Sequence, residues 1–432
     1  MKKRYSIYFQ AFTAFLFIAF TSQAQIQAPG AGYTDRTNYP VFGENDPIFI
    51  FCTTENTKTA TLRAVTNLTG TKTWLWEKFN PQSGNFDLHL SVNNSNQQHQ
   101  LTQLEDGCYR ITISKTDTVQ RYRAWVFNNW YTATASIPES NCDFFTLQGT
   151  LVQATLEYYD LASRQPVTIP KKTKTEWKLE DDILSVLLSH NVYNPPTKNT
   201  DYTFVVSDQF GCAQNVKITY TSIVTKALFA ADPMQGEAPL EVKFTNNSEN
   251  GDEGSFEWYF FRNLDDIKKE SEKSNQPVDS IDFIAYDKNP VYTYEKSGSY
   301  MVKLVSKHKS EFHTCTDTAY LSKYIVADTS FVQVPNAFSP NGDGTNDNFV
   351  VKFWSMQEVK ISVFNRWGRV VHVWQSGNVR GFKNTYLETV WDGKIGGRYA
   401  SPGVYFYVVE GLGRDGKKRW KHGNVYLFRG KD

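Results

Sequence analysis

The chain has 432 residues but only 4 methionines and 5 cysteines, and its 7 histidines are scattered. No two cysteines have the CxxC spacing of zinc or thioredoxin-like sites, and no histidines form an HxxxH or HExxH pattern. A Gly-x-Ser-x-Gly elbow and a phosphate-binding glycine loop are lacking as well. These absences remove the usual sequence marks of hydrolases, metalloenzymes and nucleotide-binding enzymes, so we predict a protein that is not an enzyme.

Long apolar runs are also scarce. One such run, at 11–20, is too short to span a bilayer. Three basic residues at 2–4 precede it and Ser22-Gln23-Ala24 follows it, an order typical of a secretory signal peptide. We therefore predict a signal peptide over residues 1–24. No cysteine follows directly, which argues against a lipoprotein anchor and predicts a soluble, exported mature chain in which disulfides can form.

Aromatic residues, in contrast, are abundant at 15%, with 24 Tyr, 30 Phe and 11 Trp. Aromatic and β-branched residues favour strands. They recur in short alternating segments between Gly, Asn and Pro turns, for example at 47–52, 73–79 and 404–409. This spacing predicts an all-β fold of tandem β-sandwiches. Helices are expected only at 264–273 and 181–189, both as insertions.

The length allows three or four domains after the signal peptide. Stretches rich in turn residues divide the mature chain into four predicted β-sandwich domains. Their predicted limits are 25–140, 141–225, 226–328 and 331–432.

The first domain contains Cys52, then a pair of tryptophans, then Asp-Gly-Cys108-Tyr109. This order resembles an immunoglobulin-like sandwich. In that family the second cysteine follows the tyrosine by two residues, whereas Cys108 precedes Tyr109 and so faces the other side of its strand. Cys52–Cys108 and Cys142–Cys212 are both disulfide candidates. Because the cysteines are odd in number, at least one is unpaired within the chain.

The second domain ends in a strand followed by Asp-x-x-Gly-Cys, which is common in exported sandwich repeats and makes it similar to an Ig or PKD domain; Trp177 is expected in its core. The third has a Pro-Leu-x-Val-x-Phe strand at 239–244, then Trp258, then Gly-Ser-Tyr300. These residues resemble a PKD domain. A polar insertion at 262–289 replaces the usual short turn and is either a binding loop or a solvated surface excursion.

Four ordered motifs occupy the last hundred residues. They are Pro-Asn-Ala-Phe-Ser-Pro-Asn-Gly-Asp-Gly, Asn-Arg-Trp-Gly, Trp-Asp-Gly, and Pro-Gly-Val-Tyr followed by a terminal strand. Together they resemble the gliding motility-associated C-terminal domain of Bacteroidota, the type B sorting signal of the type IX secretion system. The motif residues are Pro335, Asn336, Phe338, Ser339, Pro340, Asn341, Gly342, Asp343, Gly344, Asn346, Asp347, Asn365, Arg366, Trp367, Gly368, Trp391, Asp392, Gly393, Gly403, Tyr405, Gly423 and Arg429.

Local chemistry assigns structural roles to several of these residues. The Asn-Gly-Asp-Gly run favours a tight turn with positive φ angles. Trp367 is placed to cap the sandwich core, and Trp391 to anchor a turn. The terminal strand at 424–429 either pairs with a receptor through its edge or completes its own sheet.

The resemblance implies export across the outer membrane to the cell surface or the medium. It also implies two partners, the type IX secretion translocon and an SprF-like (PorP-type) outer-membrane β-barrel. The segment from Phe331 onward carries 15 Lys and Arg against 8 Asp and Glu. This basic tail suits an acidic receptor surface or an anionic surface polysaccharide. The net charge of the whole chain is only +1, which gives no reason to expect a nucleic-acid partner.

The first motif contains one candidate cation site. Asn341, Asp343 and Asp347, with the carbonyl of Thr345, alternate like the oxygen ligands of a calcium loop. Lys352 stands where an EF-hand has glutamate. A purely structural turn is favoured over calcium, and no other cofactor is expected.

Three functions remain open from the sequence. The first is an adhesin-like, non-enzymatic interaction protein at the cell surface. The second is an accessory component of the type IX secretion or gliding machinery, bound to an outer-membrane barrel. The third is a glycan-binding module, if exposed tryptophans of the first domain stack on sugar rings. The tryptophans concerned are Trp74, Trp76, Trp125 and Trp130.

Overall fold

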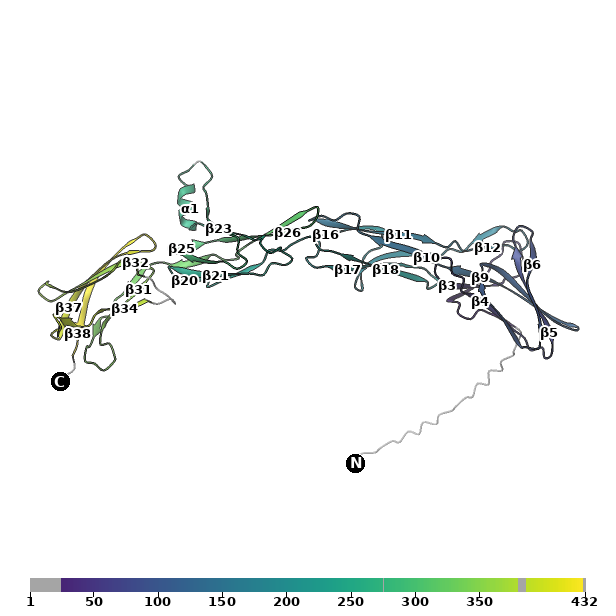
Figure 1. Cartoon of the computed structure of the whole chain (residues 1–432), viewed down its shortest axis with the longest axis horizontal. Helices are drawn as coiled ribbons and strands as arrows, with labels where there is room; N and C mark the ends of the chain where they lie inside the picture. Colours follow the sequence, from purple (N-terminus) through teal and green to yellow (C-terminus); the bar gives the residue numbers. More distant parts are fainter. Residues whose placement is uncertain (1–24, 275, 380–385, 430–432) are drawn as a thin grey trace, which may run out of the picture. The chain divides into compact units, whose positions relative to one another are not determined.

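The computed structural model describes residues 25–274, 276–379 and 386–429, so the predicted signal peptide lies outside the described residues. The described part is built from strands and contains one helix, α1 (Leu264–Ser271) (Figure 1). Within it, no helix is both long and apolar enough to cross a membrane. The prediction of an all-β chain of tandem β-sandwiches is confirmed.

The chain divides into two compact units. The first contains the described residues from Gln25 to Ser140 together with Phe145–Val192 and Thr200–Tyr220. The second contains Asn141–Phe144, Tyr193–Asn199 and the described residues from Thr221 onward. Each unit holds two sandwiches, which are described separately below.

The first sandwich packs a six-stranded sheet against a three-stranded one. The larger sheet has the order β2-β3-β9-β8-β5-β6 and the smaller one β1-β4-β7. Trp74 and Trp76 lie fully buried between them. The strands are β1 (Gln25–Gln27), β2 (Tyr33–Arg36), β3 (Pro47–Cys52), β4 (Ala60–Val65), β5 (Lys72–Asn80), β6 (Asn85–Asn94), β7 (Gln98–Leu104), β8 (Gly107–Lys115) and β9 (Thr118–Asn129).

The second sandwich has sheets of order β10-β11-β16 and β15-β14-β17-β18 around buried Trp177, as predicted for that residue. Its short β12-β13 hairpin covers the outer face of the first sandwich, where Tyr158 contacts Trp125 at 5.9 Å between ring centroids. The strands are β10 (Tyr131–Ser136), β11 (Phe144–Gln153), β12 (Glu157–Tyr159), β13 (Pro166–Thr168), β14 (Lys174–Leu179), β15 (Asp182–Ser185), β16 (Ser189–Tyr193), β17 (Thr200–Ser207) and β18 (Ala213–Tyr220). Through this hairpin the outer face of the larger sheet joins the core of the second sandwich, whereas the residues between the two sheets of the first sandwich form a separate core.

The third sandwich surrounds fully buried Trp258. Its sheets have the orders β19-β21-β24, β23-β22-β26-β27 and β20-β28-β25. The strands are β19 (Phe229–Asp232), β20 (Gln235–Glu237), β21 (Leu240–Asn246), β22 (Glu257–Phe261), β23 (Ile281–Ala285), β24 (Val291–Tyr294), β25 (Gly298–Tyr300), β26 (Val302–Lys309), β27 (Thr314–Tyr320) and β28 (Ile325–Asp328).

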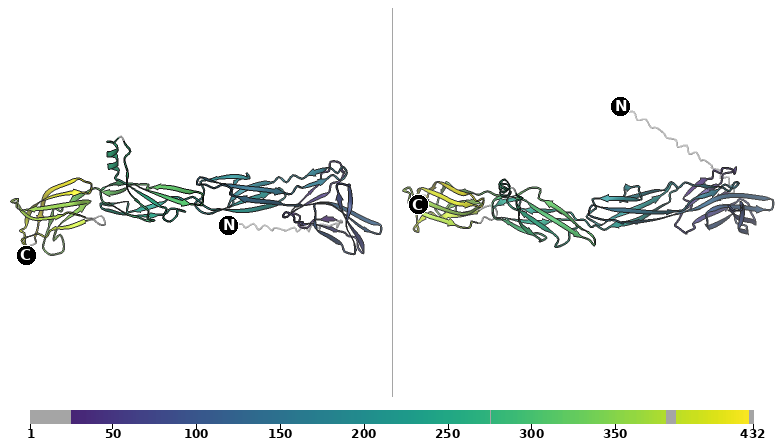
Figure 2. Two further views of the ribbon diagram at one scale, coloured as in Figure 1. Left: turned by 45° about the horizontal axis from the view of Figure 1, so that its top comes forward. Right: turned by 90° about the horizontal axis from the view of Figure 1, so that it is seen from above.

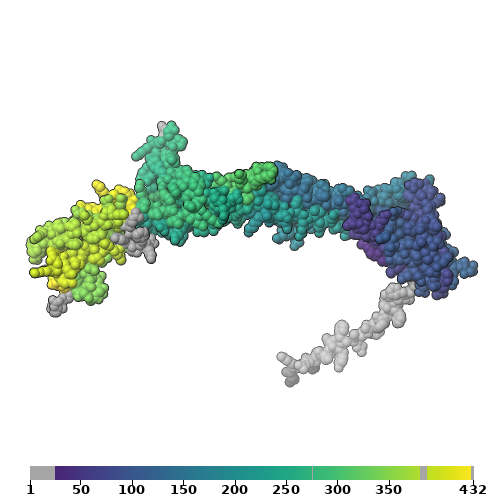
Figure 3. Space-filling view, viewed as in Figure 1, coloured from purple at the N-terminus to yellow at the C-terminus, as the bar shows by residue number. Residues whose placement is uncertain are grey.

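The polar insertion of the third sandwich contains α1, which confirms the helix predicted at 264–273. None of the residues of α1 is buried, and the helix stands out from the surface as a knob (Figure 3). Arg262 fixes its base through an ion pair with Glu270 and a hydrogen bond to the carbonyl of Asp279 at 2.9 Å. The helix predicted at 181–189 is wrong, because this segment forms β15, a bend and β16, which lie in two different sheets.

The fourth sandwich packs a five-stranded sheet of order β30-β38-β37-β32-β33 against the sheet β29-β31-β34. It is the yellow-green part of the ribbon beside the C-terminus in Figure 2. A small hairpin, β35-β36, lies at one end. The strands are β29 (Phe331–Gln333), β30 (Ala337–Phe338), β31 (Phe349–Trp354), β32 (Met356–Phe364), β33 (Val370–Ser376), β34 (Tyr386–Trp391), β35 (Lys394–Ile395), β36 (Arg398–Tyr399), β37 (Gly403–Gly413) and β38 (Lys418–Leu427).

Three of the sandwiches share one local device. In each, a Gly-x-Tyr sequence begins a strand, and the tyrosine hydroxyl donates to the carbonyl four residues earlier. The bonds run from Tyr109 to Glu105 at 3.1 Å, from Tyr300 to Lys296 at 2.8 Å and from Tyr405 to Ser401 at 2.9 Å. This arrangement matches the tyrosine corner of immunoglobulin-type sandwiches. It fixes how the chain enters the strand.

The disulfides differ from both candidate pairs. Cys52 bonds Cys212, and Cys142 bonds Cys315, so neither Cys52–Cys108 nor Cys142–Cys212 forms. Cys108 is a free, buried thiol, and it packs in a different core cluster from Tyr109, as the alternation of a strand requires.

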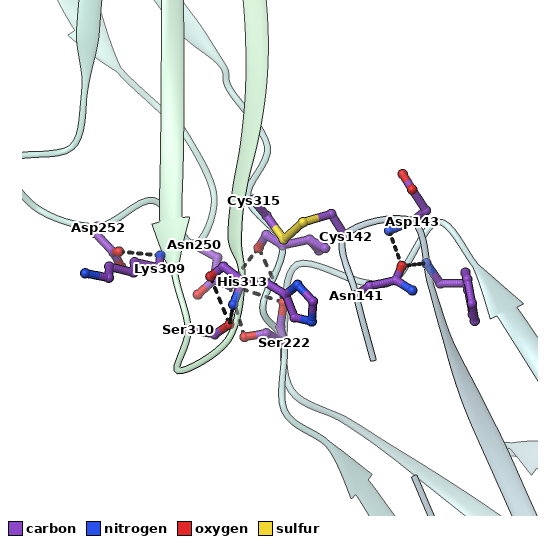
Figure 4. The surroundings of a disulfide bond; sticks show 12 residues. Asn141, Cys142, Asp143, Ser222, Asn250, Asp252, Lys309, Ser310, His313 and Cys315 are labelled. Atoms are coloured by element: carbon purple, nitrogen blue, oxygen red, sulfur yellow. Dashed lines mark hydrogen bonds between the residues drawn. A yellow bond between two sulfur atoms is a disulfide. The ribbon is translucent and has the colours of Figure 1, made fainter. Parts of the chain in front are cut away.

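The second disulfide lies within the second unit and joins the Asn141–Phe144 segment to β27 (Figure 4). Short polar turns flank it on both sides. The amide of Asp143 donates to the side chain of Asn141 at 2.9 Å, and the amide of Ser310 donates to the carbonyl of His313 at 2.8 Å. The sequence missed this pair because its cysteines lie in different predicted domains.

Candidate recognition site of the C-terminal domain

The first motif forms β30 and the turn that follows it. Phe338 is buried and contacts Trp391 and Phe349, with ring centroids 5.4 and 5.8 Å apart. Asn336 accepts a backbone hydrogen bond from Tyr426 of β38 at 2.8 Å, and Ser339 donates one to Asn346 at 2.7 Å. Asn336 and Phe338 thus attach the start of the domain to its last strand.

The Asn-Gly-Asp-Gly run is a tight turn with the predicted backbone. Gly342, Gly344 and Asn346 have φ angles of 81°, 83° and 52°. The carboxylate of Asp347 accepts from the amides of Asn341 at 2.9 Å, Gly342 at 2.6 Å and Gly344 at 2.8 Å. These amides, that of Gly342 first, lower the pKa of Asp347.

The remaining polar groups of this turn are engaged in the same way. Asp343 accepts from the amide of Thr345 at 2.7 Å and from the side-chain amide of Asn341 at 2.8 Å. Among the residues that the structure describes, no group of three or more His, Cys, Asp or Glu is arranged to hold a metal ion. The side-chain oxygens of Asn341, Asp343 and Asp347 thus accept hydrogen bonds from their own turn.

The second motif forms the hairpin tip between β32 and β33. The side chain of Asn365 accepts from the amides of Trp367 and Arg369, both at 3.0 Å, and closes the turn. Gly368 has a φ angle of 77°, as such a turn requires. Trp367 is 74% exposed, so the prediction that it caps the core is wrong. The guanidinium of Arg366 lies 4.2 Å from the centroid of the Trp367 ring.

The third motif does anchor a turn, as predicted. Trp391 is buried, and its Nε1 donates to the carbonyl of Lys394 at 2.8 Å. Asp392 accepts from the amide of Lys394 at 3.0 Å. Gly393 has a φ angle of 75°, and a Cβ there would lie only 2.9 Å from Pro340 of the first motif. The first and third motifs therefore pack directly against each other.

The fourth motif begins β37. Gly403 opens this strand, and Tyr405 packs against Trp391 with ring centroids 5.0 Å apart. Gly423 lies in β38, where a Cβ would meet the Tyr407 hydroxyl at 2.6 Å. β38 pairs with β37 along its whole length and with β30 at its end, so the terminal strand completes its own sheet. Arg429 follows β38, and its guanidinium lies 6.0 Å from the ring centroid of Tyr399.

The second and fourth motifs meet at a pocket of about 420 Å³ beside the β35-β36 hairpin. Arg366, Trp367, Gly403 and Tyr405 are motif residues that line it. Arg398 and Tyr399 line it too, and the sequence motifs did not single them out. The sequence feature that could have pointed to them is the Gly-Gly pair directly before Arg398. Such a pair is typical of a β-hairpin turn, and Arg398 and Tyr399 form the second strand of that hairpin.

The tryptophans of the first unit do not form a sugar-binding face. Trp74, Trp76 and Trp125 are buried, and Trp130 packs partly buried against the core. The indole N–H groups of Trp74 and Trp76 donate to Asn94 at 3.0 Å and His99 at 3.1 Å. The simpler interpretation of Trp74 and Trp76 as an inward-facing pair is confirmed, and the glycan-binding hypothesis loses the residues on which it rested.

No curated protein matches the chain. A crystal structure of a tetra-tandem repeat in the extending region of a large adhesion protein shares 13% identity, with 88% of this chain and 99% of that one covered and a TM-score of 0.26. The I67–I69 fragment of titin shares 11%, with 63% and 94% covered and a TM-score of 0.30. Likeness at these values assigns neither a ligand nor an activity.

The comparison with protein families concerns the C-terminal domain. Residues 332–427 match the family described as CHU_C Type IX secretion signal domain. The matched range runs from β29 to the end of β38, so it includes every strand of the fourth sandwich. It agrees with the resemblance drawn from the four motifs. Residues 332–427 of this chain are a type IX secretion signal domain.

Proposed function

We propose that this chain is an adhesin-like, non-enzymatic interaction protein, displayed on the cell surface or released after export. The observation that carries this proposal is the match of the fourth sandwich to a type IX secretion signal domain, which implies export through that system. The sequence supports a signal peptide at 1–24 for the first membrane. The sandwiches before the signal domain are then the exported cargo.

The structure of the three sandwiches before the signal domain supports a role in binding or as a spacer. Two disulfides, Cys52–Cys212 and Cys142–Cys315, join positions 160 and 173 residues apart. Disulfides persist outside the cytosol, where reducing systems are absent. The buried aromatic residues and the tyrosine corners stabilise the fold. We therefore assign the binding of other molecules to the exposed surface of these sandwiches.

The proposed partners are the type IX translocon and an SprF-like (PorP-type) outer-membrane barrel, with surface polysaccharide as a further candidate. Deleting 331–432 tests the route. We expect the truncated protein to stay in the periplasm, whereas the full chain is accessible to protease added outside intact cells. Extracellular truncated protein would refute the proposal.

The alternative role as an accessory part of the secretion or gliding machinery predicts a different distribution. A machinery component would co-purify with an outer-membrane barrel in a fixed ratio after detergent extraction. An exported adhesin would appear in excess over any barrel at the surface or in the medium. Quantitative mass spectrometry of both fractions separates the two roles.

A further inference from the structure

The pocket beside the β35-β36 hairpin is lined by cations and aromatic rings. Its charged residues are Arg366 and Arg398, and its exposed rings are Trp367 and Tyr399. None of its lining residues in the described part of the chain is Asp or Glu. Neither arginine forms an ion pair with a carboxylate of the residues described. The site therefore offers two guanidinium groups that no acid among the described residues neutralises.

More positive charge lies around Tyr399. The ammonium of Lys394 lies 5.1 Å from the centroid of this ring, and the Arg429 guanidinium lies 6.0 Å from it. Lys394 also lies 3.6 Å from Asp392, which partly offsets its charge. The field at the pocket is thus positive, and it favours an anionic ligand.

The shape and the walls of the pocket narrow the choice of anion. A guanidinium matches a carboxylate with two parallel hydrogen bonds. Ile395 and Val404 add apolar wall beside the rings. A cavity of about 420 Å³ holds one or two side chains. It is concave, whereas a membrane surface requires a broad basic face. Exposed Trp, Tyr and Arg are also the residue types that dominate binding energy between proteins.

We propose that this pocket is a docking site for an acidic peptide segment of a partner protein, which presents one or two carboxylates beside an apolar side chain. The proposal rests on the proposed function, because export gives the signal domain a protein to meet. Beyond the proposed function, it specifies which face of the signal domain contacts the partner and the chemistry of the partner segment that this face binds.

The first test is export of the full chain carrying Arg366→Glu and Arg398→Glu. We expect extracellular protein to fall about tenfold or more, the effect of losing interface anchors. The matched control is Lys418→Glu with Lys421→Glu, which changes the charge of the same domain equally at two exposed positions outside the pocket. Trp367→Ala should also reduce export, and Trp420→Ala, another exposed tryptophan of this domain, should not.

These outcomes separate the two proposals. Normal export of the Arg366→Glu, Arg398→Glu chain, alongside loss of export on deleting 331–432, overturns the docking site and leaves the export route intact. Equal loss in the lysine control also overturns it, since net charge then explains the effect. Thermal unfolding of the purified full-length variants controls for misfolding, and we expect midpoints equal to that of the wild type.

The second test identifies the ligand class. Tyr399→p-benzoylphenylalanine places a photoreactive group at the pocket of the full chain in living cells. We expect a covalent adduct whose sequenced cross-linked peptide carries Asp or Glu within a few residues of the attachment point. Adducts to polysaccharide or lipid alone, to a peptide without acidic residues, or no adduct at all would each overturn the proposal.

Discussion

Two tryptophans of the signal domain should respond in opposite ways to the same substitution. Trp391 is 1% exposed, and Trp367 is 74% exposed, although both belong to motifs of the same domain. Trp391 packs against Phe338 and Tyr405 and donates its indole N–H to the carbonyl of Lys394. Trp391→Ala removes all of these contacts and leaves a cavity.

The size of the effect follows from burial. Replacing a buried Trp with Ala costs about 3–5 kcal/mol. A domain of this size is stable by about 5–15 kcal/mol, so the loss is a large fraction of the total. Trp367→Ala removes an exposed ring and should change the stability by less than about 0.5 kcal/mol.

Native-state hydrogen exchange of the full chain, read by mass spectrometry on peptides from β37 and β38, measures this difference within the signal domain. We expect Trp391→Ala to lower the opening free energy of these strands by about 3 kcal/mol or more. Trp367→Ala should leave it unchanged while reducing export. A similar loss of protection in both variants would contradict this expectation, and so would an opening free energy lowered by less than about 1 kcal/mol in Trp391→Ala.

Three further predictions concern single contacts. Tyr405→Phe deletes the hydroxyl bonded to Ser401 and should destabilise the signal domain by about 1 kcal/mol in calorimetry, whereas Tyr426→Phe, at an exposed ring, should not. Burial raises the pKa of Asp160, but hydrogen bonds from four backbone amides outweigh it and lower the pKa to about 2. The stability that this carboxylate contributes to the folded state is therefore present above its unfolded pKa of about 4 and is lost as the pH falls towards 2. Asp160→Asn should remove this acid dependence from unfolding curves of the first unit. Calcium at millimolar concentration should not shift the melting of the signal domain, and heat of binding that disappears in Asp347→Asn would show that the turn does hold the ion.

Much of the fold could be predicted because it depends on local patterns. Alternation and turn residues predicted the strands, and Trp177 and Trp258 were found at the centres of their sandwiches. The resemblance of the four motifs led to the signal domain, which the family comparison confirmed. Each of these features depends on residues that lie close together in the sequence.

Features that depend on distant contacts were missed. The Cys52–Cys212 and Cys142–Cys315 pairs join residues from different predicted domains, which no spacing rule reveals. Segment 181–189 has apolar residues at helical intervals, but its ends pair in separate sheets. The side of the hairpin on which Trp367 lies depends on the Asn365 turn, so its exposure could not be deduced from its aromatic character.

The match of residues 332–427 to a type IX secretion signal domain implies that the C-terminal domain directs export. A passenger protein that carries residues 1–24 at its start and 329–432 at its end tests this claim directly in a cell that has a type IX secretion system. Protease added to intact cells, or recovery from the medium, measures how much passenger has crossed the outer membrane. We predict that the passenger is extracellular with residues 329–432 and periplasmic without them. A passenger that stays periplasmic with the intact domain, in cells that still export their own type IX cargo, would contradict the account.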